Sequence, residues 1–252
     1  MIDFHTHTPL WRTTSWLGGA TFGVDEFVGF MDGAGIDRAV VLSHDALYRA
    51  RPEANDDLAT FVKAHPERLV GFGTVTPRDP DAAAEAERMF AQLGLRGMKL
   101  HPWLQGFSVH EATLDPICEV VADAGGMLLC HDGTPPYSTA SQIAALARRH
   151  PRLPVVLGHG GLHDLWREAL AMTQETENLY LCICGTPPYA ARTILAEAPA
   201  HKVLFGTDAG LSDKASQDYA VARIREIDGW GITPAQRHAM LVANPARLLA
   251  AA

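Results

Sequence analysis

The chain has 252 residues, a formal net charge of −8 at pH 7, 47% hydrophobic residues and 20% charged residues. This composition is typical of a globular protein and excludes an intrinsically disordered one. The acidic balance and the lack of a clustered basic face argue against a nucleic-acid partner, because binding to a phosphate backbone needs concentrated Lys and Arg.

Short apolar runs alternate with longer segments of helical spacing along the chain. The runs are rich in Val, Ile and Leu and predict buried parallel strands. They are Ile2–His5, Ala39–Leu42, Leu69–Phe72, Gly97–Leu100, Met127–Cys130, Val155–Leu157, Leu179–Ile183 and Val203–Phe205. The predicted helices are Asp56–Ala64, Asp81–Leu93, Ala112–Ala124, Ser141–Arg149, Leu162–Thr173, Ala190–Ala198, Gln217–Ile227 and a closing helix Pro234–Leu249 with Thr233 as its N-cap.

This alternation predicts an α/β protein with a single (β/α)8 barrel over residues 1–252 and a closing C-terminal helix. The length agrees with the roughly 250 residues of such a barrel. A doubly wound open sheet is the other architecture for such repeats, but no Gly-rich phosphate loop follows the first strand. In a barrel, the reactive residues are expected at the carboxyl ends of the strands.

Location and redox state follow from features that the sequence lacks. No apolar run approaches the roughly 18 residues that cross a bilayer, and the first strand begins almost at Met1, where a signal peptide would have no room. We therefore expect a cytoplasmic protein with no membrane partner. The four cysteines lack the spacing of a zinc or disulfide scaffold and are expected to be reduced in the core.

Five polar side chains lie where predicted strands end. His5 and His7 are two apart on the first strand, so they share a face. His131, His159 and Asp208 end the fifth, sixth and eighth strands. Because lone His or Asp groups buried beside an apolar core are costly, five of them at one rim indicate a shared divalent cation.

The fourth strand adds Lys99 and His101, which share the inward face. Three interpretations are open for Lys99: a binder of a substrate carboxylate, an ion-pair partner of Asp208, or a carboxylated lysine that bridges two metals. The first two are favoured together, because nothing in the sequence demands a second ion. His101 is expected in the pocket, with an ordinary hydrogen-bonded histidine as the alternative.

The ordered set of His5-x-His7, Lys99-x-His101-Pro102, His131, His159 and Asp208, with Asn244-Pro245-Ala246-Arg247-Leu248 near the end, resembles the amidohydrolase superfamily. More narrowly, it resembles the amidohydrolase-related branch that includes aminocarboxymuconate-semialdehyde decarboxylase, resorcylate decarboxylases and lactone hydrolases. The resemblance implies that His5, His7, His131 and Asp208 bind a metal, usually zinc, with manganese or a second ion as alternatives. It also implies that His159 is catalytic, supports a ligand or binds a second ion, and it is compatible with a homodimer.

These residues predict a hydrolase of a small amide, lactone or ester carbonyl that uses metal-activated water. Asp208 would accept the proton, His159 would polarise the carbonyl, and Lys99 or His101 would anchor a substrate carboxylate. The alternative is a non-oxidative decarboxylase of an aromatic or enol acid on the same site. Aromatic residues in the loops after the first and fourth strands would suit a planar substrate; they are Trp11, Trp16, Phe22 and Trp103. Two repeated Gly-Thr-Pro-Pro-Tyr loops, which end in Tyr137 and Tyr189, are expected to shape a pocket on the same rim.

Overall fold

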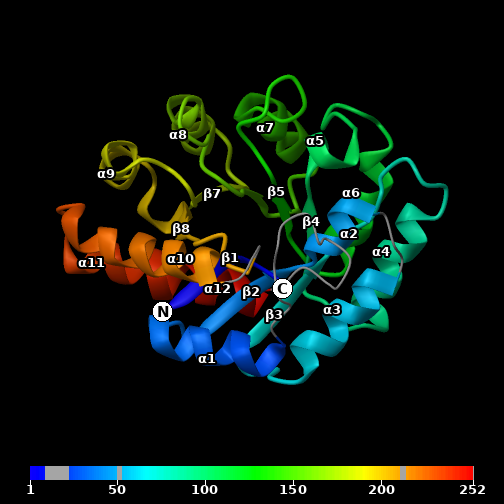
Figure 1. Cartoon of the computed structure of the whole chain (residues 1–252). Helices are drawn as coiled ribbons and strands as arrows, with labels where there is room; N and C mark the ends of the chain where they lie inside the picture. The colour runs from blue at the N-terminus through cyan, green and yellow to red at the C-terminus, as the bar shows by residue number, and fades with distance from the viewer. Residues whose placement is uncertain (9–22, 50–52, 211–213, 252) are drawn as a thin grey trace.

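Eight parallel strands pair in chain order and alternate with helices that surround them (Figure 1). The computed structural model describes residues 1–8, 23–49, 53–210 and 214–251. The strands are β1 Ile2–His7, β2 Arg38–Leu42, β3 Leu69–Gly73, β4 Gly97–Leu100, β5 Leu128–Cys130, β6 Val155–Leu157, β7 Leu179–Ile183 and β8 Val203–Phe205. The predicted (β/α)8 barrel is confirmed, and the last three strands and β4 have the predicted bounds.

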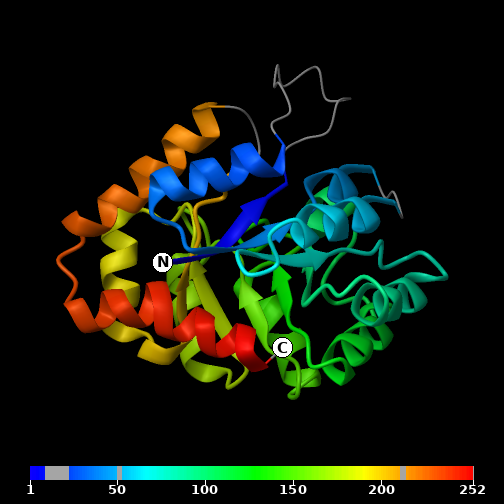
Figure 2. The same ribbon diagram turned by 90° about the horizontal axis from the view of Figure 1, so that it is seen from below.

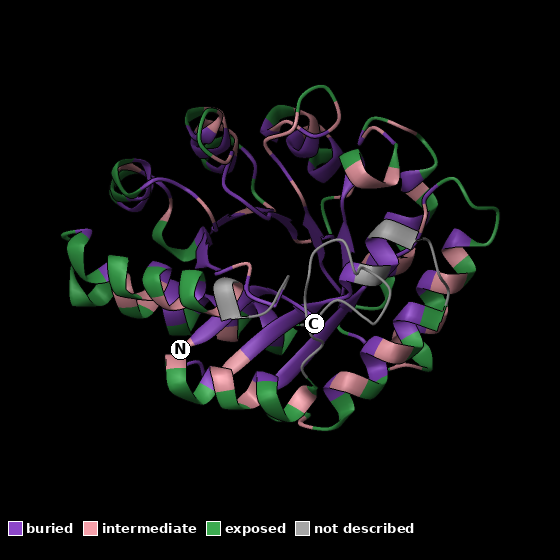
Figure 3. Cartoon of the chain, viewed as in Figure 1, coloured by how far each residue is buried: buried purple, intermediate pink, exposed green. Residues whose placement is uncertain are grey.

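The helices lie outside the strands (Figure 2), and most of the exposed residues lie on the helices and loops (Figure 3). They are α1 Val24–Ala34, α2 His44–Arg49, α3 Glu53–Lys63, α4 Ala82–Ala91, α5 Pro102–Gln105, α6 Leu114–Asp123, α7 Ala140–Arg149, α8 Trp166–Glu175, α9 Pro188–Glu197, α10 Lys214–Glu226, α11 Pro234–His238 and α12 Asn244–Ala251. The sequence patterns did not predict α1, α2 or the single turn α5. In α1, Gly29 and Gly33 weaken the helical pattern, because glycine is a poor helix former.

Two apolar clusters hold the layers together. The larger one packs the outward faces of the strands against the helices. The smaller one fills the barrel, where Phe4 meets the edge of Phe72, and it extends to Leu248 and Leu249 of α12. Because α12 contributes to this inner cluster, it helps to close the amino-terminal end of the barrel and leaves the opposite end for the site.

The predicted closing helix is continuous but not uniform. Between α11 and α12 the chain makes a π-turn, η4 Ala239–Ala243, with its wider hydrogen bonding. The next residues explain it, because Pro245 has no N–H to donate to the preceding turn. Thr233 caps α11 as predicted, with its hydroxyl accepting from the N–H of Gln236. Asn244 ties the segment to β8 by donating to the carbonyl of Val203.

A shift of register in β1 affects the direction of its histidine side chains. The pairing of β1 with β2 shifts register between Asp3 and Thr6. Phe4 belongs to the inner apolar cluster, yet His5 also reaches into the barrel, where its ring contacts Lys99 of β4. A bulge of this kind re-aims a side chain next to a site. Simple alternation along the strand is therefore not what brings His5 inside.

Two further predictions concern location and cysteines. Within the described residues, none of the helices has the length and apolarity needed to cross a membrane. All four cysteines are free and buried, as predicted for a reduced core.

Candidate metal centre

Three donor atoms converge where β1 and β8 end. Asp208 Oδ1 lies 2.9 Å from His7 Nε2 and 3.4 Å from His5 Nε2. In a tetrahedral zinc site with bonds of roughly 2.0–2.1 Å, neighbouring ligand atoms lie about 3.3 Å apart. The His5, His7 and Asp208 donors are thus spaced as ligands of one small cation would be.

The tautomer of His5 shows why a cation fits between these groups. His5 Nδ1 lies 2.9 Å from the carbonyl oxygen of Gly158, an acceptor only, so Nδ1 must carry the proton. Burial lowers the pKa of His5 well below its ordinary value, so the ring is neutral and its Nε2 presents a lone pair. That lone pair faces the Asp208 carboxylate, and two acceptors 3.4 Å apart repel unless positive charge from Lys99 or from a metal ion lies beside them. The donor set therefore fits a divalent metal ion.

Asp208 is held in a conformation that side chains seldom adopt. Its φ is +62°, in the left-handed region. The backbone on both sides is fixed, because the N–H of Asp208 donates to the His5 carbonyl at 2.8 Å and the N–H of His7 donates to the Ala209 carbonyl at 2.7 Å. Burial opposes ionisation of Asp208, but the hydrogen bond from His7 and the nearby imidazoles lower its pKa well below the usual range. The carboxylate is ionised, and its side chain remains 28% exposed to solvent.

Lys99 is almost completely buried, with 1% of its surface exposed. Its Nζ lies 3.3 Å from His5 Nε2. Burial lowers the pKa of Lys99, while the carboxylate of Asp208 acts on it through charge and partly offsets that effect. The amine thus places a proton donor beside the nitrogen lone pair of His5, next to the three converging donors.

The remaining predicted histidines form a continuous row along the rim. The His159 ring lies 4.7 Å from the His5 ring and 4.4 Å from the His131 ring, centroid to centroid. His131 in turn stacks on His101, with centroids 3.7 Å apart and planes 14° from parallel. Among the described residues, His131 is outside the compact donor groups. The structure therefore brings His5, His7 and Asp208 together, with His159, His131 and His101 next in line.

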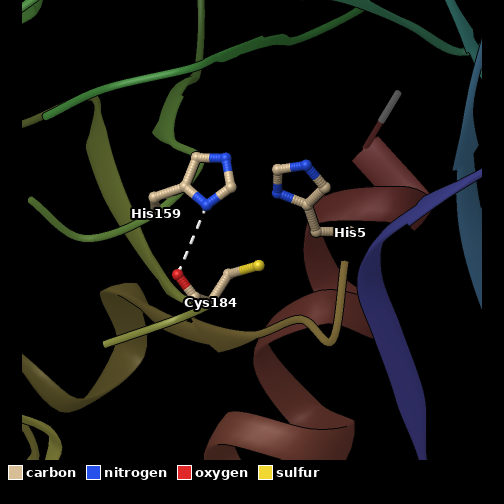
Figure 4. Close-up of side chains that lie close together, drawn as sticks. All are labelled: His5, His159 and Cys184. Carbon is tan, nitrogen blue, oxygen red and sulfur yellow. Dashed lines mark hydrogen bonds between the residues drawn. The ribbon is translucent and has the colours of Figure 1, made fainter. Parts of the chain in front are cut away.

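His159 and His101 have opposite hydrogen-bonding character. His159 Nδ1 lies 3.3 Å from the Cys184 carbonyl and must donate, so Nε2 is an acceptor (Figure 4). His101 Nδ1 accepts from the N–H of Leu104, so its Nε2 carries the proton. Burial lowers the pKa of His159 to about 4 and that of His101 to about 2, which keeps both rings neutral. At this site His101 is the donor and His159 the acceptor.

The sulfur of Cys184 points into the space between the rings of His5 and His159 (Figure 4). These three residues form a second group of donors within 4.8 Å of one another. Both imidazoles, however, use Nδ1 to donate to backbone carbonyls, and burial raises the pKa of the thiol well above its ordinary value. Because metals bind the thiolate and not the thiol, we assign no second ion to this group.

Four site residues were not predicted from the sequence. His44 follows β2, its ring stands perpendicular to that of His7 at 5.2 Å, and burial lowers its pKa to about 3. Asp132 follows His131 and accepts the N–H groups of His159 and Gly161, both at 2.6 Å. Asp3 and Cys184 complete the set. Each of the four lies in or just after a strand. The expectation that reactive residues follow the carboxyl ends of strands, which located His131, could therefore also have found His44, Asp132 and Cys184.

The rim also carries exposed aromatic residues. Trp103 in α5 is 56% exposed, and its ring lies 6.1 Å from that of His101. Tyr189, the last residue of the second Gly-Thr-Pro-Pro-Tyr repeat, lies in the first turn of α9; it is exposed and packs edge-to-face with Trp166. The predicted rim residues Trp11, Trp16 and Phe22 lie outside the described residues.

A family model described as amidohydrolase matches residues 2–250, so the chain belongs to this family. The predicted resemblance is confirmed over essentially the whole chain. With the fold and the strand-end residues together, the protein belongs to the amidohydrolase-superfamily barrels.

Solved structures share the fold at low sequence identity. The 5-carboxyvanillate decarboxylase of Sphingomonas paucimobilis has a TM-score of 0.77 at 18% identity, covering 99% of this chain and 98% of that one. The same enzyme from Novosphingobium aromaticivorans, complexed with manganese, has a TM-score of 0.76 at 18% identity, covering 99% and 96%. A probable 2-pyrone-4,6-dicarboxylic acid hydrolase from Acinetobacter baumannii has a TM-score of 0.74 at 15% identity, covering 99% and 98%. Decarboxylases and a hydrolase thus share this architecture.

Proposed function

We propose that this protein is a metal-dependent hydrolase of a small amide, lactone or ester carbonyl. The observation that carries the proposal is the opposition of the His5 lone pair and the Asp208 carboxylate at 3.4 Å, with His7 completing the donor set. His131, which follows His159 in the row of rings, is proposed as a further ligand. The ion would be zinc or manganese, since imidazole and carboxylate together suit both metals.

A divalent cation at this position supplies positive charge that polarises a carbonyl and acidifies water. Asp208 is ionised and partly exposed, so its carboxylate accepts the proton of the attacking water and passes it to the leaving group. His159 presents an acceptor at Nε2, which favours a role in holding or accepting a proton over donation to a developing oxyanion. That donation falls instead to His101 and Lys99, whose N–H groups also suit a substrate carboxylate.

A second candidate is a non-oxidative decarboxylase on the same site. Two observations favour it: Trp103 offers an exposed planar surface beside His101, and several similar structures are those of aromatic-acid decarboxylases. In this reaction Lys99 and His101 would hold the departing carboxylate, and Asp208 would carry the proton to the ring carbon. A planar hydroxylated aromatic acid would then be the substrate.

The two reactions are distinguished by their products. The metal-stripped full-length protein is reloaded with zinc or manganese and incubated with lactones, esters and amides, and separately with hydroxylated aromatic acids. Ring opening or hydrolysis without CO2 release supports the hydrolase, whereas CO2 release supports the decarboxylase. Asp208→Asn should lower kcat by roughly 10²–10⁴-fold in either case, while Asp123→Asn, a control at a surface ion pair with Arg152, should leave it unchanged. Full activity of the Asp208→Asn variant would overturn the proposal.

A further inference from the structure

A buried carboxylate joins the two strands that supply the converging donors. Asp3 of β1 has no exposed surface. Its Oδ1 accepts the N–H of His5 at 3.2 Å and the N–H of Thr207 at 3.1 Å. Its Oδ2 accepts the Thr207 hydroxyl at 2.6 Å. Asp3 therefore accepts hydrogen bonds from backbone and hydroxyl groups at the junction of β1 with the segment after β8.

The Thr207 hydroxyl carries this connection past Asp208. It donates to Asp3 and accepts the N–H of Ala209 at 3.2 Å. Ala209 in turn accepts the N–H of His7, and Asp208 donates to the carbonyl of His5. The left-handed Asp208 thus lies between two anchored residues. Thr207 is hydrogen-bonded to Asp3, and Ala209 is hydrogen-bonded to the Thr207 hydroxyl.

A carboxylate taken out of water without a cationic partner costs free energy. The three hydrogen bonds that Asp3 accepts offset part of that cost. A carboxylate does offer several acceptor positions at fixed geometry, enough for two N–H groups and one hydroxyl at once. Its value here lies in setting the positions of His5 and of the segment that carries Asp208.

We propose that Asp3 and Thr207 are positioning residues that set the spacing of His5, His7 and Asp208 for the metal ion. This inference rests on the proposed metal site. Neither residue touches the ion; both act through the backbone that carries its ligands. A similar arrangement is found after β5 and β6, where the buried carboxylate of Asp132 accepts hydrogen bonds from the N–H groups of His159 and Gly161.

The test uses Thr207→Val, which removes the hydroxyl and keeps the shape, with Thr207→Ser as the matched control that keeps the hydroxyl. The metal-stripped full-length proteins are titrated with Mn²⁺ and Zn²⁺ by calorimetry, and the Co²⁺-loaded proteins are compared by visible absorption. We expect Thr207→Val to bind Mn²⁺ and Zn²⁺ about 10- to 100-fold more weakly and to change the Co²⁺ spectrum, which reports ligand geometry. Thr207→Ser should match the wild type in both measurements.

Two outcomes separate this inference from the proposed function. If the wild type binds none of these ions, the metal site itself is wrong. If the wild type binds them and Thr207→Val binds as tightly with an unchanged Co²⁺ spectrum, the positioning role is wrong. Should Thr207→Val fail to fold, Asp3→Asn serves instead, because it keeps the shape and one acceptor oxygen but places an NH2 group against the Thr207 hydroxyl. Wild-type affinity and spectrum in that variant would also overturn the inference.

Discussion

Gly210, two residues after Asp208, is a position where a single added carbon would disturb the closure of the barrel. A Cβ at this residue would lie 1.9 Å from the carbonyl oxygen of His7 and 2.8 Å from its carbonyl carbon. The glycine also has a φ of +97°, which other residues rarely adopt. Gly210→Ala must therefore push the segment after β8 away from β1 and weaken the hydrogen bond between His7 and Ala209.

The expected loss has two parts. The left-handed conformation costs an alanine about 1–2 kcal/mol, and forcing a methyl group against fixed backbone adds about 1–3 kcal/mol. The matched control is Gly94→Ala, because Gly94 has a φ of +70° but no atom within 4 Å of its added Cβ. The control should therefore show only the first part, while Gly210→Ala loses roughly 2–5 kcal/mol in total.

Urea unfolding of the metal-free proteins, followed by circular dichroism, measures both free energies. The entropy that alanine removes from the unfolded chain is common to the two variants and cancels in their difference. The Gly210→Ala variant should also bind metal more weakly, because Asp208 moves with the segment. An equal loss in the two variants would refute the reasoning that β1 and the residues after β8 are in direct backbone contact at this point.

Three further predictions address other parts of the molecule. Burial raises the pKa of all four thiols, that of Cys118 to about 12; a disulfide reagent at pH 8 should therefore titrate no thiols in the native protein and four after denaturation, and rapid native labelling would contradict this. The hydrogen bond from His150 lowers the pKa of Asp115, so the stabilisation from this ion pair is present above the ordinary carboxyl pKa and is lost as the pH falls through the lowered value. Asp115→Asn should therefore lower the free energy of unfolding at pH 7 by up to about 1 kcal/mol and make no difference near pH 2. A difference between variant and wild type that persists in acid would contradict this prediction. Trp103→Ala should raise KM about tenfold or more without changing the unfolding midpoint, whereas Trp103→Phe should keep KM near the wild-type value; an unchanged KM in the alanine variant would remove Trp103 from substrate binding.

Most of the strands were predictable because they are short runs of mainly apolar residues buried on both faces. Val155–Leu157 and Leu179–Ile183 have the predicted bounds, since the barrel and the helices both demand apolar side chains there. The helices were less predictable where tertiary packing outweighs local propensity. The glycines of α1 weaken its helical pattern in the sequence, although Phe27 and Met31 anchor this helix in the core. In the closing helix, Pro245 accounts for a π-turn where a regular helix was predicted.

The sequence predicted which strand ends carry the site residues, but not how their side chains are arranged. Sequence position located His5, His7 and Asp208. The register shift in β1, however, arises only in its pairing with β2, and the left-handed Asp208 only where the segment after β8 meets β1. The hydrogen-bonding roles of His159 and His101 depend on a backbone carbonyl and a backbone N–H that no motif specifies. Asp3 was overlooked because two of its three hydrogen bonds come from Thr207 at the other end of the chain.

The central claim is that His5, His7 and Asp208 bind one divalent ion. Metal analysis of the full-length protein after reconstitution with zinc or manganese and removal of free metal tests it most directly. The wild type and a surface control, His65→Ala, should retain about one equivalent, while His5→Ala should retain less than about a tenth. Less than about half an equivalent in the wild type, or undiminished metal in His5→Ala, would contradict the account.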